Sequence, residues 1–428
     1  MNKSYRANVG RWLPAAALMV LLALPAAGQD GADPQLAALV AEAAERNPDV
    51  QAVRREVAAA RSRIAPAGAL DDPMLEVGVI NVPVESLSLR REDMTMKMIG
   101  LTQRLPYPGK RALRRELAQK EAEAAENNLQ ELVNRVRRDV KVAYFDLGLT
   151  DESLRLAESN RRVLQQFLSI AEARYGVGQS TQADVLKAQT QVSKMLEELI
   201  KLGRERPMLE AELNRAAGRG SAPRSVSPGP ARAREVSLRP EDLRAVARAN
   251  RPQLLAQQRM MDRSMKALDL ARKDYYPDFD VRLSYGQRDS TQDMRREDMI
   301  SFTVAINLPI WRESKREPRV ADAEAMRDQA SAMYQARLNE LDAMLRQQMA
   351  AAEQTLKAVR LYESALLPQA RLTADASLSA YRVGRVDFFT LLDSRMTVFN
   401  VEISYAASLA AYNKALAEVE FLTGAPLF

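Results

Sequence analysis

The chain is built from two copies of one plan, and this duplication limits its fold more than any single motif does. Tyr175-Gly-Val-Gly178 in the first half returns as Tyr381-Arg-Val-Gly384 in the second, 206 positions later. Proline landmarks repeat at nearly the same distance: Pro48 with Pro252 and Pro73 with Pro277, both 204 positions apart, and Leu105-Pro106 with Leu308-Pro309, 203 positions apart. Such a repeat predicts that both halves fold as the same unit.

Each half is predicted to contain a first helix, two short strands, a very long helix, a tight turn and a returning helix. We divide the chain into a signal peptide at 1–28, a first repeat at 29–220, a connector at 221–240 and a second repeat at 241–428. Both repeats belong to one domain. The connector is rich in Pro, Ser and Gly, which indicates a linker that lies against the outside of the helices.

The first residues have the pattern of a secretory signal peptide. Basic residues precede an apolar run from Leu13 to Leu24, and the small residues Ala26-Ala27-Gly28 follow it. A membrane anchor would need about 20 apolar residues, and this run is shorter. No other stretch of the sequence is as apolar over that length. If the mature chain enters a membrane, we therefore expect it to do so as strands.

The sequence contains no cysteine and no histidine. This removes the disulfide, the thiolate metal site and the commonest general base. We therefore do not expect an enzyme, and we expect no cofactor. The formal net charge is +6, and Arg and Glu alternate along helical stretches, which is typical of solvated helix faces and not of a nucleic-acid-binding stripe.

Two segments are long enough to form unusually long helices. Lys110 to Arg174 contains 65 residues with no proline and a single glycine, and at 1.5 Å per residue it would reach about 100 Å. Val320 to Tyr381 has a similar reach, interrupted near Pro368. Apolar residues recur at alternating threes and fours in these segments and in the returning helix after Leu391, which is coiled-coil spacing.

Three of the four predicted strand segments alternate between apolar and polar residues, as strands with one buried face do. The clearest is Phe279 to Tyr285, and a second runs from Ile300 to Ile306. Leu75 to Val79 alternates in the first half. Met94 to Leu105 has apolar residues on both faces of the strand, so the face that it would turn to lipid stays open. The lengths are close to the 9 to 11 residues that cross a bilayer obliquely.

Methionines are frequent in and beside these strands: Met74, Met94, Met96, Met98, Met294 and Met299. Thioethers favour monovalent copper or silver. The alternative is that these side chains only face lipid.

Four strands cannot close a barrel, and an open edge in lipid would leave backbone groups unpaired at several kcal/mol each. Several chains must share the barrel. Three copies would provide twelve strands and space for a water-filled pore, so we predict a homotrimer, with an assembly of two as the rival.

The turn residues have local explanations. Gly178 and Gly384 can end a helix in the left-handed conformation. Thr181 and Asp184 fit a capping box for the next helix, and Asp387 can cap the equivalent helix in the second half.

The strongest motifs are Arg174 to Gly178 leading to Asp184-Val-Leu186, Tyr381 to Gly384 leading to Leu391-Leu392-Asp393, and the strand exit Gln103 to Lys110. With the duplication, the paired strands and the helix lengths, the mature chain resembles the TolC-like outer-membrane efflux channel family. The resemblance implies a mostly α fold with a shared twelve-stranded transmembrane β-barrel and a periplasmic helical tunnel. It places the protein in the outer membrane of a Gram-negative bacterium.

The resemblance also implies partners and sites. A periplasmic adaptor would dock on the two turns, through the residues Tyr175, Val177, Gly178, Tyr381, Val383 and Gly384, and connect the duct to an inner-membrane pump of the RND type. Asp393 would form an acidic pore gate. The strand exit looks most like members that serve heavy-metal exporters. Two alternatives are a type I protein-secretion duct and a periplasmic coiled-coil protein without a pore.

Overall fold

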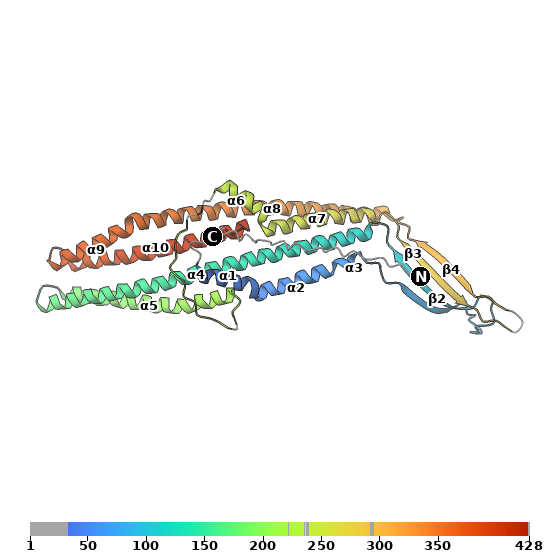
Figure 1. Cartoon of the computed structure of the whole chain (residues 1–428), viewed down its shortest axis with the longest axis horizontal. Coiled ribbons are helices and arrows are strands. Elements are labelled where there is room, and N and C mark those ends of the chain that lie inside the picture. The colour runs from blue at the N-terminus through green and yellow to red at the C-terminus, as the bar shows by residue number, and fades with distance from the viewer. Residues whose placement is uncertain (1–32, 221, 235, 237–238, 292–294, 427–428) are drawn as a thin grey trace, which may run out of the picture.

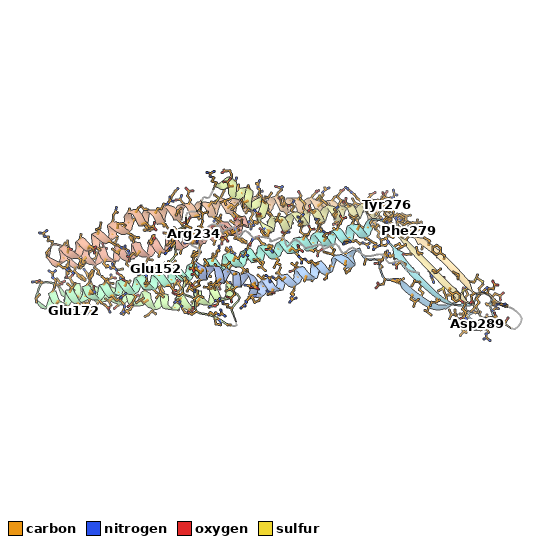
Figure 2. All side chains as sticks on the ribbon, in the orientation of Figure 1. Glu152, Glu172, Arg234, Tyr276, Phe279 and Asp289 are labelled. Carbon is orange, nitrogen blue, oxygen red and sulfur yellow. The ribbon has the colours of Figure 1, made fainter. Side chains whose placement is uncertain are left out.

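The computed structural model describes residues 33–426 except 221, 235, 237, 238 and 292–294. The predicted signal peptide lies outside the described residues. The molecule is long, with helical turns at one end and a small sheet at the other (Figure 1). Glu172 lies near the helical tip and Asp289 at the far end of the sheet (Figure 2).

The described elements follow the same plan in both halves, except that the first half has an extra short helix and the long helix of the second half is divided in two. In the first half they are α1 (Pro34–Arg46), α2 (Pro48–Ser62), α3 (Ile64–Gly68), β1 (Met74–Ile80), β2 (Met96–Leu105), α4 (Lys110–Gly176) and α5 (Gln182–Ala216). In the second half they are α6 (Pro240–Asn250), α7 (Pro252–Lys273), β3 (Phe279–Gln287), β4 (Met299–Ile306), α8 (Glu317–Leu361), α9 (Leu367–Arg382) and α10 (Phe388–Thr423).

The first helix that the sequence predicted in each half is broken into two, α1 and α2 in the first half and α6 and α7 in the second. The break falls before Pro48 in the first half and before Pro252 in the second, and each proline is the first residue of the second helix. Proline fits there because it has no N–H to donate. At the first break the Asn47 side chain accepts a hydrogen bond from Asp49 N at 2.9 Å and donates one to Ala216 O at 3.1 Å.

Helix α4 is continuous over 67 residues, about 100 Å at the α-helical rise. Its counterpart in the second half is interrupted, as expected near Pro368. There Tyr362–Leu366 forms a π-helical turn between α8 and α9. The proline removes one backbone donor, and a local change of hydrogen-bond spacing accommodates it.

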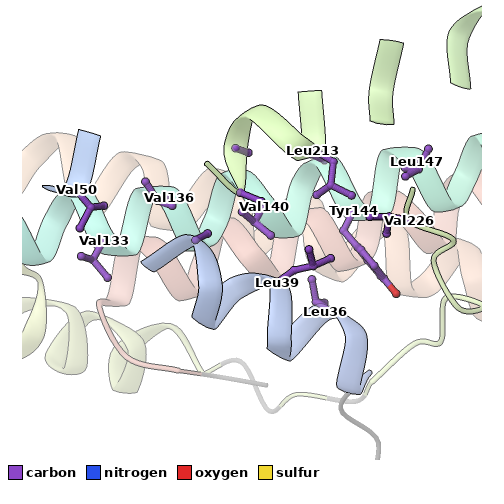
Figure 3. Packing of buried hydrophobic residues seen from close by; sticks show 14 residues of the cluster. Leu36, Leu39, Val50, Val133, Val136, Val140, Tyr144, Leu147, Leu213 and Val226 are labelled. Carbon is purple, nitrogen blue, oxygen red and sulfur yellow. The ribbon is translucent and has the colours of Figure 1, made fainter. Parts of the chain in front are cut away.

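The core is divided along the length of the molecule. Near the middle, α1, α2 and α5 pack on α4 through a cluster of buried apolar residues (Figure 3): Leu36, Leu39, Val50, Val133, Val136, Val140, Tyr144, Leu147, Leu213 and Val226. A second cluster lies toward the tip and joins α4, α5, α9 and α10.

Among the described residues, three ion pairs join the two halves along α4 and α10. Their N···O distances are 2.8 Å for Arg138–Glu418, 2.7 Å for Lys141–Glu420 and 2.7 Å for Lys414–Asp146. Desolvation is the largest influence on Lys141 and lowers its pKa, against the attraction of Glu420.

The connector is held on the helical surface over its described part. Val226 is buried against the middle cluster, and its N–H donates to Glu210 Oε1 at 2.9 Å. Further along, Tyr412 donates its hydroxyl to Arg234 O at 2.5 Å.

The strands form one antiparallel sheet in the order β1-β2-β3-β4. The central pair joins the two halves, because β2 pairs with β3 from Lys97 opposite Gln287 to Leu105 opposite Phe279. Strands β1 and β4 are therefore the two edges. Within the described part of the chain, no helix is both long and apolar enough to cross a bilayer.

Candidate functional site

The two turns at the helical tip have the same backbone structure. Gly178 and Gly384 both have φ of +73°, in the left-handed region that glycine adopts without strain. In the first turn Gly178 N donates to Tyr175 O at 3.0 Å and Gln179 N to Arg174 O at 2.8 Å. In the second, Gly384 N donates to Tyr381 O at 3.1 Å and Arg385 N to Ala380 O at 2.9 Å.

The side chains of the two turns differ in exposure. Tyr175 is 50% exposed, and Val177 and Val383 are 68% and 69% exposed. These three side chains are free to contact a partner. Tyr381 is only 4% exposed, so its side chain is not presented at this surface.

Tyr381 instead joins the two helical hairpins. The Arg174 guanidinium lies 4.6 Å from the centre of the Tyr381 ring, and its NH1 donates to Tyr381 O at 2.6 Å. The Phe388 ring packs edge-on against Tyr381 with centroids 5.7 Å apart. The link spans 207 positions of sequence, which is why local reasoning about the turn did not find it.

Helix α5 begins with the capping arrangement that its sequence suggests. Asp184 N donates to Thr181 Oγ1 at 3.3 Å, and Thr181 N donates to Asp184 Oδ2 at 3.1 Å. Burial raises the pKa of Asp184, but hydrogen bonds from Thr181 and Ser180 outweigh it and hold the pKa below its usual value.

Helix α10 begins at the equivalent cap. Asp387 Oδ1 accepts a hydrogen bond from Thr390 N at 2.8 Å. Hydrogen bonding from Thr390 holds the pKa of Asp387 below its usual value.

Asp393 lies on the exposed face of α10, less than two turns after this cap. Its neighbours Leu392 and Ser394 are buried, so the carboxylate points away from the helix packing. Lys187 of α5 lies 5.4 Å above the Phe389 ring of α10 and ties the starts of these two helices together.

At the other end of the molecule, the sheet has two different faces. Because side chains alternate along a strand and the strand registers are known, each face can be assigned. The apolar face carries Leu75, Val77, Val79, Ile99, Leu101, Leu283, Tyr285, Ile300, Phe302, Val304 and Ile306, with Lys97 and Gln287 at its loop end. The polar face carries Glu76, Gly78, Met96, Met98, Gly100, Thr102, Arg282, Ser284, Gly286, Met299, Ser301 and Thr303, together with the apolar Met74, Ile80 and Ala305.

This assignment answers the question that the sequence left open for β2. Ile99 and Leu101 belong to the apolar face, whereas Met96 and Met98 belong to the polar face. These two methionines therefore lie on the face opposite the apolar one. On the same face Arg282 pairs with Glu76 at 2.5 Å.

The junction between sheet and helices contains a buried lysine that sequence analysis missed. Lys110 is 3% exposed, and its Nζ lies 2.9 Å from Asp278 Oδ1 and 3.1 Å from Tyr276 O. The Tyr107 and Tyr276 rings stack with centroids 4.6 Å apart. A basic residue just after one strand exit and an acid just before the next strand were the available signal.

Comparisons with known proteins agree with this fold. A family profile described as outer membrane efflux protein matches residues 39–219 and 243–425. The cobalt-zinc-cadmium resistance protein CzcC of Cupriavidus metallidurans is 23% identical over 316 residues, which is 74% of each chain.

Solved structures share the fold. The outer membrane protein VceC of Vibrio cholerae superposes with a TM-score of 0.77 at 17% identity, covering 92% of this chain and 97% of VceC. The open state of the MtrE outer membrane channel of Neisseria gonorrhoeae gives 0.76 at 16% identity, covering 92% and 90%.

Proposed function

The chain belongs to the outer membrane efflux protein family, and from this premise we propose that three copies form the exit duct of a tripartite efflux system. The protein is an outer-membrane channel whose helical body extends into the periplasm. The proposal adds the number of copies, the partners, the docking and gate residues and the cargo. We propose no catalytic activity for it.

The two free edges of the sheet support assembly into a closed ring. Among the described strands, β1 and β4 have no neighbour on their outer sides, and the apolar face is exposed, with Val77 at 76% and Phe302 at 68%. In a bilayer that face suits lipid, but unpaired edge groups would each cost several kcal/mol. Pairing β4 of one copy with β1 of the next removes both edges, and three copies give twelve strands.

The tip supports docking of a periplasmic adaptor. Tyr175, Val177 and Val383 present apolar side chains beside two turns of identical backbone structure. In the described part of the chain, a Cβ at Gly178 or Gly384 would meet no atom beyond the adjoining residues closer than 3.9 Å, so the backbone is open to close approach. We place the adaptor here, with an RND-type pump beyond it in the inner membrane.

Asp393 is our candidate for the gate. Three exposed carboxylates near the tip would make a negative ring that admits cations and resists anions. In planar bilayers, Asp393→Asn should lower the selectivity for K⁺ over Cl⁻. The matched variant Asp375→Asn on α9 should leave it unchanged. Equal selectivity in Asp393→Asn and in the wild-type protein would refute the gate.

Heavy-metal cations are the proposed cargo, because the resemblance to CzcC covers 74% of both chains. A strain lacking the gene should become more sensitive to cobalt, zinc or cadmium salts, and the wild-type gene should restore growth. If tolerance is unchanged while the purified protein still conducts ions, the cargo is wrong and the channel stands. A protein that neither needs detergent nor conducts ions would refute the channel itself.

A further inference from the structure

We propose that Met96, Met98 and Met299 form a site for a soft monovalent metal ion, Cu(I) or Ag(I), on the polar face of the sheet. The inference rests on the proposed function, because that face encloses a lumen only when the copies close their sheets into a ring. It then places thioethers on the wall of the lumen near the outer mouth. The site would favour these monovalent ions over the cobalt and zinc ions in the name of the CzcC relative.

The strand register brings these methionines to one place. Met98 lies opposite Gly286, and Gly286 lies opposite Met299. Adjacent strands are about 4.8 Å apart, so the two methionines flank a single glycine from either side. Gly78 flanks Met98 on its other side, which leaves room for flexible side chains along this row.

Met96 supplies a third sulfur above the same glycine. A Cβ built on Gly286 would overlap Met96 Sδ, so this sulfur occupies the space that any larger residue would fill. Met96 is 9% exposed, and the methionine on either side of the glycine can reach that space by rotating its three side-chain bonds. The arrangement therefore allows three thioethers to reach one point.

The surrounding charges do not exclude a monovalent cation. Arg282 NH2 donates to Met98 Sδ at 3.4 Å, but this guanidinium is paired with Glu76 at 2.5 Å. The backbone of Arg282 is four positions along β3 from Gly286, about 13 Å in a strand, so its guanidinium touches Met98 but lies away from the space above the glycine. Met96 and Met299 are therefore the principal ligands, and Met98 joins them only when its sulfur turns away from Arg282.

The ligand set also defines the class of metal. Among the described residues, no group of three or more His, Cys, Asp or Glu is placed to hold a metal ion. Thioether sulfur is a soft donor that suits Cu(I), whereas magnesium, calcium and manganese require oxygen ligands and zinc is bound through nitrogen, thiolate or carboxylate. A methionine-only site should therefore distinguish Ag(I) from Zn²⁺.

The test uses the full mature protein in detergent, labelled with ¹³C at the methionine methyl groups and titrated with silver nitrate in chloride-free buffer. We expect saturating shifts of the Met96, Met98 and Met299 signals, and no such shifts with zinc nitrate. The variant Met96→Leu/Met98→Leu/Met299→Leu keeps the side chains apolar and similar in volume. Its affinity for Ag(I) should fall at least about tenfold, the factor that loss of a mere outer-shell partner costs at metal sites.

The matched control is Met208→Leu/Met326→Leu/Met333→Leu, which replaces three exposed methionines on α5 and α8. It should bind Ag(I) as the wild-type protein does. Equal affinity in the sheet variant and the wild-type protein, or shifts spread evenly over exposed methionines, would refute the site. Ion conductance without silver is measured in parallel: if it is normal, only the site fails, and if the wild-type protein does not conduct, the proposed function fails.

Discussion

The seam between neighbouring copies can be tested with a pair of cysteines, because the chain has none of its own. We predict that the double variant Val79→Cys/Val304→Cys oxidises to a covalent trimer in the outer membrane. Each copy would contribute the new thiol on β4 to one neighbour and the new thiol on β1 to the other. A closed ring of three should therefore be the largest product.

The choice of residues follows from the internal repeat. Leu105 of β2 lies opposite Phe279 of β3, where the first half of the chain meets the second. The seam between copies is the equivalent meeting of a second half with a first half. By the spacing of the proline landmarks, Leu308 is the second-half counterpart of Leu105, and Leu75 is the first-half counterpart of Phe279.

Antiparallel pairing from that starting point sets Val304 opposite Val79. Both belong to the apolar face, so the predicted register keeps apolar side chains on one side of the ring. A shift by one residue would place them on opposite faces.

The geometry of the sheet gives the expected contrast. Directly opposed Cβ atoms are about 5 Å apart, and a disulfide requires about 4 Å, a difference that small strand movements close. A shift of two residues adds about 6.8 Å along the strand and brings the separation to about 8 Å. Val79→Cys should therefore cross-link with Val304→Cys far more than with Phe302→Cys or Ile306→Cys, and not at all with Thr303→Cys.

The assay is electrophoresis without reductant on protein extracted from outer membranes, with dithiothreitol as the reversal. The pairing registers of the β1–β2 and β3–β4 hairpins differ by two residues. Met74 pairs with Thr102 in the first hairpin. In the second, Ala305, the counterpart of Thr102, pairs with Asp280, two residues beyond the counterpart of Met74. A strongest product at Phe302 or Ile306 would show that the landmarks do not set the register. A closed dimer, or no product at any position, would refute the shared ring of three.

Further predictions concern the junction and the tip. Lys110→Met removes the partner of Asp278 and should lower the free energy of unfolding by about 3 kcal/mol, as for other broken buried pairs, measured by thermal melting against the exposed control Lys357→Met. Gly384→Ala forces a Cβ into the left-handed region and should cost about 1 kcal/mol, seen as faster amide exchange in the turn, whereas Gly203→Ala in α5 should not. Asp184 and Asp387 have lowered pKa values in the folded chain, so their caps stabilise the tip fully above the ordinary Asp pKa of about 3.9. This stabilisation is lost as pH falls through the pKa values of the folded chain, so amide exchange at the tip should rise below about pH 4. A ratio of exchange rates between the tip and the middle cluster that does not change with pH would contradict this. Thr181→Ala should cost about 1 kcal/mol at neutral pH, read by the same exchange measurement.

The helices and turns were predictable because their signals are local. Helix α4 begins at Lys110 as expected and ends two residues beyond Arg174, since its sequence contains nothing that interrupts a helix. The left-handed turns at Gly178 and Gly384 follow from glycine in a helix-ending context.

The facing of β2 and the position of Tyr381 were not predictable in this way. Strand β2 has apolar residues on both faces. Only its pairing with the strands that carry Glu76 and Arg282 shows which of its faces is polar. Tyr381 is covered by a side chain from the other half of the molecule. Both depend on contacts between residues far apart in sequence.

The duplication also explains why the tip should present a threefold pattern and not a sixfold one. The two turns share their backbone structure, but the repeat places Ala380 where the first half has Arg174. Arg174 covers Tyr381, whereas an alanine has no guanidinium with which to cover Tyr175 of a neighbouring copy. In the proposed ring of three, the six turns would therefore expose only three tyrosines. An adaptor that reads these side chains would distinguish first-half turns from second-half turns, even though the backbone treats them alike.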